Sequence, residues 1–124
     1  TRWVKQHQPT RHLPIGYFGA STGAAAALQA AAALCEGVCA VVSRGGRPDL
    51  AGSHELMRVK SPTLLLVGGR DDEVIELNRE AHEWLPCTKE LSIIPGATHL
   101  FEETGTLEEV ARQATAWFNQ YLKT

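Results

Sequence analysis

The stretch LPIGYFGASTGAAAALQAAAAL, residues 13–34, changes from an apolar and aromatic run into an alanine-rich one, with Ser21 between the two. Aromatic and β-branched residues favour strands, so the first part predicts a short strand that contains Leu13, Ile15, Tyr17 and Phe18. Alanine is the strongest helix former, so TGAAAALQAAAAL predicts a helix. Ser21 should therefore lie at the turn between a strand and a helix.

Strands and helices continue to alternate along the rest of the chain. Apolar and β-branched runs predict further strands at residues 38–43, 63–69 and 89–94. Helical spacing predicts a short helix at 49–58 and longer ones at 73–85 and 106–122. Alternating strands and helices form parallel sheets with right-handed crossovers. We therefore expect an α/β fold, an open and mainly parallel sheet of four strands with flanking helices.

Three of these elements carry more specific predictions. The unbroken apolar run at 63–69 suits a strand covered on both faces, and the first strand resembles an interior strand that lacks a neighbour. Thr106 and Glu109 have the spacing of a capping box at the start of the last helix. The predicted apolar stripe of the 73–85 helix is Val74, Leu77, Ala81, Trp84 and Leu85, and that of the last helix is Leu107, Val110, Ala111, Ala114, Trp117, Phe118, Tyr121 and Leu122.

Length and composition limit the possible classes of protein. The 124 residues allow one domain, 44% of them are hydrophobic, and the net charge of -2 gives no basic field for nucleic acid. The apolar stretch 24–35 is interrupted by Gln29 and is shorter than the roughly 20 residues of a membrane span. We expect residues 1–124 to form a single, partial domain, because the chain is small for an enzyme and begins with Thr1.

The three cysteines, Cys35, Cys39 and Cys87, lack the spacing of a zinc or redox motif. Free cysteine is often buried, so we expect reduced thiols in the core and a cytoplasmic location. No metal ion or organic cofactor is implied by these residues or by any other motif.

The turn after the first strand has the pattern Gly-x-Ser-x-Gly, as Gly19-Ala20-Ser21-Thr22-Gly23. In hydrolases this pattern places a nucleophilic serine on a strained turn, and both glycines are expected to avoid clashes with it. The backbone amide of Thr22, at the positive end of the helix dipole, would supply half of an oxyanion hole. The alternative is that Ser21 only caps the helix.

A serine hydroxyl becomes a useful nucleophile when a base accepts its proton and an acid orients that base. Asp71 follows the third strand and His99 follows the fourth, so both should lie at the carboxyl edge of the sheet, where such folds gather their sites. Asp72 is the second candidate for the acid, and this acidic cluster could instead be a solvated helix start. The other histidines do not follow strands; they are His7, His12, His54 and His82.

These residues resemble the α/β-hydrolases, and within them the dienelactone-hydrolase-like group. The resemblance rests on FGASTGAAAAL, SRGGRPDLAG, SPTLLLVGGRDDEV and PGATHLFEE, and SRGGRPDLAG is most similar to hydrolase domains associated with phosphoribosyltransferases. It implies Ser21 as nucleophile, Asp71 as acid, His99 as base and the Thr22 amide as an oxyanion donor. Dienelactone hydrolases proper use cysteine as the nucleophile, so Ser21 indicates the serine-dependent relatives.

Members of this family carry several strands before the nucleophile, including the loop that donates the second oxyanion amide. The chain therefore resembles the C-terminal half of an α/β-hydrolase, and residues 1–12 resemble the end of the helix that leads into the nucleophile strand. Loss of one oxyanion donor would cost about 3 kcal/mol of transition-state stabilisation. A homodimer or a complementing N-terminal half would be the expected protein partner.

Two functions follow as hypotheses. The first is a serine hydrolase that cleaves an ester or related acyl bond of a small molecule through a Ser-Asp-His triad and an acyl-enzyme. The second is a non-catalytic binding or assembly module derived from a truncated hydrolase. A nucleotide-binding domain is a weaker third, because GASTG lacks the GxGxxG spacing and the lysine of a phosphate loop.

Overall fold

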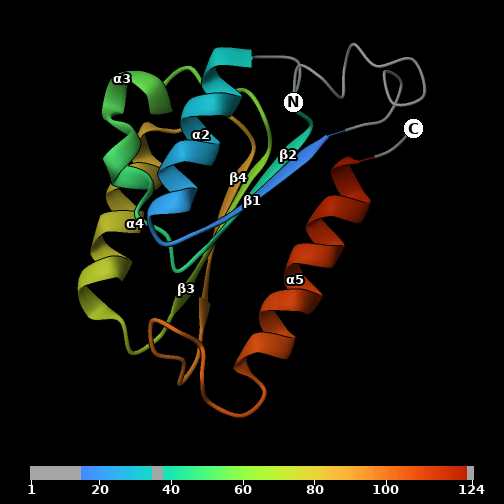
Figure 1. Ribbon diagram of the computed structural model, residues 1–124. Coiled ribbons are helices and arrows are strands. Elements are labelled where there is room, and N and C mark those ends of the chain that lie inside the picture. Colours follow the sequence, from blue (N-terminus) through green and yellow to red (C-terminus); the bar gives the residue numbers. More distant parts are fainter. Residues whose placement is uncertain (1–14, 35–37, 123–124) are drawn as a thin grey trace.

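A computed structural model describes residues 15–34 and 38–122, and its ribbon is shown in Figure 1. The sheet has the order β1-β2-β3-β4, and every neighbouring pair is parallel. Its strands are β1 (Gly16–Ala20), β2 (Ala40–Arg44), β3 (Thr63–Gly68) and β4 (Lys89–Ile94). The predicted four-stranded parallel α/β fold is therefore confirmed.

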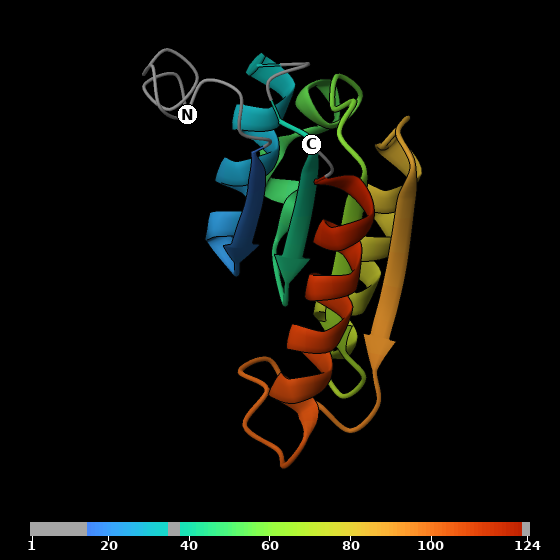
Figure 2. The same cartoon turned by 90° about the vertical axis from the view of Figure 1, so that its right-hand side faces the viewer.

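Two layers of helices cover the sheet. The helical elements are α2 (Thr22–Leu34), η2 (Pro48–Ala51), α3 (Ser53–Leu56), α4 (Asp72–Trp84) and α5 (Thr106–Tyr121). Because the strand order advances steadily in one direction, right-handed crossovers place α2, α3 and α4 on one face. The last helix, α5, covers the opposite face, as the two views in Figures 1 and 2 show.

Each face of the sheet has its own hydrophobic core. Leu28, Val41 and Leu65 lie in the core beneath α2, α3 and α4. Val42, Leu66 and Trp117 lie in the core beneath α5. All six residues of β3 are buried, as expected for a strand covered on both faces. The central strands therefore fix the positions of the loops at their carboxyl ends.

Several local predictions were wrong. The expected helix at 49–58 is divided into η2 and α3 at Gly52, whose φ of 87° belongs to the left-handed region. Of the stripe predicted for 73–85, Ala81 and Leu85 are buried, but Trp84 is 45% exposed. Ile75 and Asn78 of α4 are buried although the stripe did not include them. Asn78 is buried because its amide donates to the carbonyl of Gly46 at 3.0 Å, a contact that hydrophobic periodicity does not reveal.

The start of α5 also differs from the expected capping box. The N-cap is Gly105, at a φ of 83°, and the Thr106 hydroxyl donates to the Glu103 carbonyl at 2.7 Å. Glu109 pairs with Arg112 one turn further along. Of the predicted stripe, Val110, Ala114 and Trp117 are buried, but Leu107 is 49% exposed and Ala111 is also exposed.

Some expectations fall on residues that the structure does not describe. These are the helical character of residues 1–12, the start of the first strand at Leu13, the environment of Cys35, and the positions of His7 and His12. Cys39 and Cys87 are free thiols and are half-buried, and Cys87 packs against the core beneath α2, α3 and α4. Within residues 15–34 and 38–122, no helix is long and apolar enough to cross a membrane.

Candidate active site

Ser21 occupies the turn between β1 and α2, as predicted. Its φ of 51° is left-handed, which is a strained conformation for a residue with a side chain. The turn is held by hydrogen bonds to its backbone, because the Ser21 carbonyl accepts from the amide of Arg47 at 3.0 Å and from that of Ala24 at 3.3 Å. The constrained turn directs the hydroxyl to the carboxyl edge of the sheet.

The two glycines of the motif differ in how closely other backbone atoms approach them. A Cβ on Gly19 would lie 2.7 Å from the Gly23 carbonyl oxygen and 2.8 Å from the Ala24 amide nitrogen, so no side chain fits there. A Cβ on Gly23 would meet no described atom within 4 Å. The expectation that both glycines avoid clashes around Ser21 therefore holds, within the described residues, for Gly19 alone.

The loops after β3 and β4 bring Asp71 and His99 to the same edge. The Ser21 Oγ lies 3.0 Å from His99 Nε2, and His99 Nδ1 lies 2.9 Å from Asp71 Oδ2. A carboxylate can only accept, so in the neutral imidazole Nδ1–H donates to Asp71 and Nε2 accepts from the Ser21 hydroxyl. Three side chains from distant parts of the sequence thus form one hydrogen-bonded chain.

Asp71, and not Asp72, makes this contact. Asp71 is the N-cap residue of α4, but its side chain makes no capping hydrogen bond, so its carboxylate is available to His99. Its side chain is 17% exposed, whereas that of His99 is 40% exposed. Asp72 is the exposed first residue of α4 and follows the ordinary preference of acids for a helix start.

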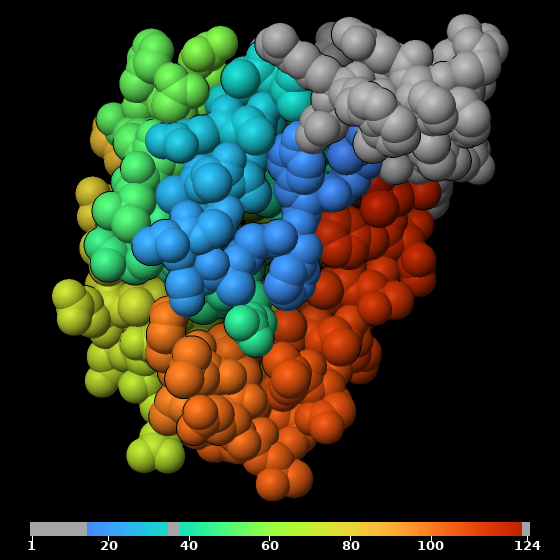
Figure 3. All heavy atoms as spheres, viewed as in Figure 1, coloured from blue at the N-terminus to red at the C-terminus, as the bar shows by residue number. Residues whose placement is uncertain are grey.

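The acid loop and the histidine loop are joined through their backbones. The amide of Arg70 donates to the Ala97 carbonyl at 3.0 Å, and that of Gly69 donates to the Ile94 carbonyl at 2.8 Å. In Figure 3 the orange loop between β4 and α5 lies on the surface directly below the blue β1–α2 turn. These contacts fix the separation of the two loops independently of the side chains.

Thr22 is the first residue of α2, so its amide belongs to the helix start, where amides lack acceptors within the helix. This position suits the oxyanion role expected of it. Among the described histidines, His54 lies on α3 and His82 on α4, and His99 is the one hydrogen-bonded to Ser21. Burial is the main cause that lowers the pKa of His82, and the nearby Lys89 lowers it further.

The sequence did not reveal how the histidine loop is supported. Glu103 accepts hydrogen bonds from both the amide and the hydroxyl of Thr98, the residue before His99. The Arg44 guanidinium lies 5.7 Å from the centre of the Phe101 ring, which is buried in the same loop. Both contacts join residues whose pairing leaves no periodic signal in the sequence.

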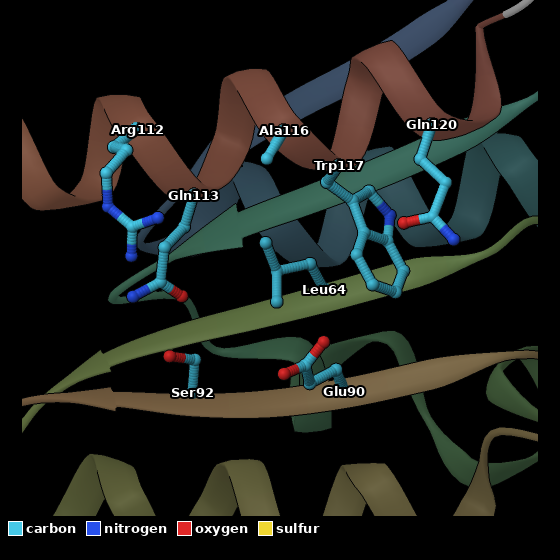
Figure 4. A pocket seen from close by; sticks show the side chains of 8 residues that line it. All are labelled: Leu64, Glu90, Ser92, Arg112, Gln113, Ala116, Trp117 and Gln120. Carbon is cyan, nitrogen blue, oxygen red and sulfur yellow. The ribbon is translucent and has the colours of Figure 1, made fainter.

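A separate groove of about 360 Å³ lies between α5 and the pair β3–β4. Trp117, Arg112 and Glu90 are among its lining residues, as Figure 4 shows, and Ser21, Asp71 and His99 are not. In the part of the chain that the structure describes, no cluster of His, Cys, Asp or Glu could hold a metal ion.

A parallel sheet that presents Ser, His and Asp from loops at its carboxyl edge, with the serine on a strand–helix turn, is the arrangement typical of α/β-hydrolases. The particular resemblance is to a dienelactone hydrolase from Anabaena variabilis. That structure is 56% identical, with a TM-score of 0.96 over 98% of this chain and 56% of the other. The resemblance to the dienelactone-hydrolase-like group is therefore confirmed.

Two further comparisons show how much of other proteins this chain matches. A Mycobacterium tuberculosis protein, named as a candidate phosphoribosyl transferase, is 58% identical over 122 residues, which are 98% of this chain but 27% of that protein. The esterase domain of a Rhodothermus marinus protein shares the fold at 20% identity and a TM-score of 0.81, over 98% of this chain and 66% of the other. No family model matches the chain.

Proposed function

We propose that this chain carries the nucleophile, base and acid of a serine hydrolase that cleaves ester or related acyl bonds of small molecules. The observation that carries the proposal is the hydrogen-bonded chain from Ser21 through His99 to Asp71, with heavy-atom distances of 3.0 and 2.9 Å. Each distance is within the range of a working proton relay. The similarity to a dienelactone hydrolase supports the same reaction class.

The reaction would proceed in two halves. Ser21 Oγ attacks the carbonyl carbon of the substrate while His99 Nε2 accepts the hydroxyl proton, and the resulting oxyanion receives a hydrogen bond from the Thr22 amide. His99 then gives the proton to the leaving alcohol, and the acyl group remains on Ser21. Water then attacks the acyl carbon while His99 accepts its proton. The bond to Ser21 Oγ breaks, Oγ takes the proton back from His99, and the acid is released. Asp71 stays ionised and stabilises the imidazolium.

The name of the mycobacterial relative refers to a different reaction, phosphoribosyl transfer. We assign hydrolysis to the described residues because Ser21, His99 and Asp71 form one hydrogen-bonded chain. The chain spans 27% of that relative, so most of the relative lies outside the aligned region. The hydrolase and the transferase chemistry are expected to belong to different parts of such proteins.

A fluorophosphonate probe followed by peptide mass spectrometry tests the proposal. Label is expected on the peptide that contains Ser21, to be lost in Ser21→Ala, and to form more slowly by several orders of magnitude in His99→Ala. Ser53→Ala is the matched control, because Ser53 is an exposed serine at the start of α3. Label that persists at the same rate in Ser21→Ala would overturn the assignment.

The second candidate is a non-catalytic assembly module, and the observation in its favour is the exposure of Phe18. This side chain is 51% exposed on β1, at the edge of the described sheet. Edge strands with exposed apolar side chains pair readily with other chains. A stable dimer that takes no fluorophosphonate would favour this function, and labelling of Ser21 would exclude it.

A further inference from the structure

The loop between β4 and α5 has to hold His99 in one orientation although the side chain is 40% exposed. An exposed imidazole has few packing contacts, so its orientation depends on the backbone that carries it. Phe101 of the same loop has a left-handed φ of 56°, and its amide donates to the Thr98 carbonyl at 3.1 Å. Residues 98–101 thus form a tight turn around His99.

Glu103 fastens this turn at its beginning. Glu103 Oε1 accepts from the Thr98 amide at 2.9 Å, and Oε2 accepts from the Thr98 hydroxyl at 2.8 Å. Both carboxylate oxygens therefore bind the residue that precedes His99. Such a two-point contact fixes the direction of the backbone more strictly than a single hydrogen bond could.

The backbone of Glu103 is fastened in turn to α5. Its carbonyl accepts from the Thr106 hydroxyl at 2.7 Å and from the Thr106 amide at 3.1 Å. Thr106 is buried as the first residue of α5, which packs on the sheet. Glu103 thus connects the base of the candidate site to a rigid element of the fold.

The contacts depend on an ionised carboxylate. The pKa of Glu103 is lowered, first by the hydrogen bond from the Thr98 amide and then by that from the Thr98 hydroxyl. The neighbouring Glu102 is exposed and makes no hydrogen bond or ion pair among the described residues. The two adjacent glutamates therefore differ in their contacts with the histidine loop.

We infer that Glu103 is a positioning residue, which through Thr98 holds the His99 imidazole within hydrogen-bond distance of both Ser21 and Asp71. This inference rests on the proposed hydrolase function. Glu103 itself touches none of the reacting groups. Its loss lets the imidazole leave its place, and misplacement by about 1 Å lowers a reaction rate by up to about 100-fold.

Ester hydrolysis by the full protein provides the first measurement, with p-nitrophenyl acetate as substrate. Glu103→Gln keeps the size but removes the charge and one acceptor, so the Thr98 hydroxyl would have to accept from the new NH2 group instead of donating. Thr98→Val removes the hydroxyl. Both variants are expected to lower kcat by about 10- to 100-fold with KM unchanged. Thr98→Ser, which keeps both donors, and Glu102→Gln, the matched control, should retain the parent kcat.

Nitrogen NMR of the His99 ring provides a second measurement that does not need activity. The parent is expected to show the Nδ1–H tautomer and a far-downfield proton on the hydrogen bond to Asp71, both retained in Glu102→Gln. Glu103→Gln should lose that proton signal and mix the tautomers. If the parent protein hydrolyses no ester and is not labelled by the fluorophosphonate probe, the proposed hydrolase function is wrong. The NMR result alone then decides whether Glu103 positions His99.

The inference is overturned if Glu103→Gln and Thr98→Val keep the tautomer and the downfield proton of the parent. It is also overturned if they lower kcat no more than Glu102→Gln does. If Thr98→Ser also lowers kcat, the effect comes from packing of the threonine methyl group. That result would count against the inference as well.

Discussion

At the scale of single residues, the reactivity expected of Ser21 depends on the absence of a side chain at Gly19. The backbone of β1 and that of α2 approach each other there, and a Cβ would lie 2.8 Å from the Ala24 amide nitrogen. Backbone atoms cannot move aside as the end of a flexible side chain can. The sequence pattern thus predicted a steric need for glycine before Ser21, and the nearest atoms belong to Gly23 and Ala24 of α2.

Gly19→Ala is expected to destabilise the 124-residue chain by about 1–3 kcal/mol, as overpacking usually does, and to abolish fluorophosphonate labelling of Ser21. Gly23→Ala is the matched control, because a Cβ there meets no described atom within 4 Å and Gly23 lies in α2. Alanine should stabilise that helix by up to about 1 kcal/mol. Thermal unfolding and the probe assay together check both variants, and equal stability of Gly19→Ala and the parent would contradict the clash.

At the scale of elements, the segment with the strongest helix-forming composition was predicted correctly, whereas segments with a weaker helical pattern were not. The alanine-rich run became α2 over the predicted residues 22–34. The predicted 49–58 helix failed because Gly52 breaks it at a φ of 87°. The stripe of the 73–85 helix was correct for Ala81 and Leu85 but missed Asn78, which is buried and donates to the carbonyl of Gly46, far away in the sequence. Burial that depends on a distant partner leaves no periodic signal.

The beginning of α5 shows the same limit, since a plausible capping box gave way to a glycine in the left-handed region. Gly105 has a φ of 83°, whereas Glu109 pairs with Arg112 on the exposed surface of the helix. A surface ion pair is screened by water and contributes little to stability. The backbone conformation at Gly105 should therefore matter more than the charge at Glu109.

Gly105→Ala is expected to lower the free energy of unfolding by about 1–2 kcal/mol, the usual cost of a left-handed conformation for a residue with a Cβ. Glu109→Gln should leave the midpoint of thermal unfolding nearly unchanged. Chemical denaturation of the two variants beside the parent measures the difference. A larger loss of stability in Glu109→Gln than in Gly105→Ala would contradict this prediction and support the capping box of Thr106 and Glu109.

At the scale of the whole molecule, the convergence of Ser21, Asp71 and His99 follows from strand order. Parallel strands end at one edge of the sheet, so residues that follow β1, β3 and β4 meet although up to 78 positions separate Ser21 from His99. The sequence therefore predicted the meeting of the loops. It could not predict the support from Glu103, because that contact depends on the path of one irregular loop.

The sheet also has one edge where its apolar surface is poorly covered. Phe18 pairs in register with Val42, on the face that α5 covers elsewhere, but Phe18 remains 51% exposed. On the same face α5 reaches only the beginning of β1, where the Phe118 ring lies close over Gly16. Within the described residues, no strand pairs with the outer edge of β1.

An exposed aromatic side chain on an open strand edge favours association between chains. We therefore expect the 124-residue chain to self-associate in sedimentation velocity, and Phe18→Asp to shift it towards the monomer, because a charge resists burial in such an interface. Leu50→Asp is the matched control: Leu50 is also 51% exposed, but it lies on η2 and not at the sheet edge. A parent that sediments as a monomer, or a Phe18→Asp variant that associates as the parent does, would show that this edge needs no second copy.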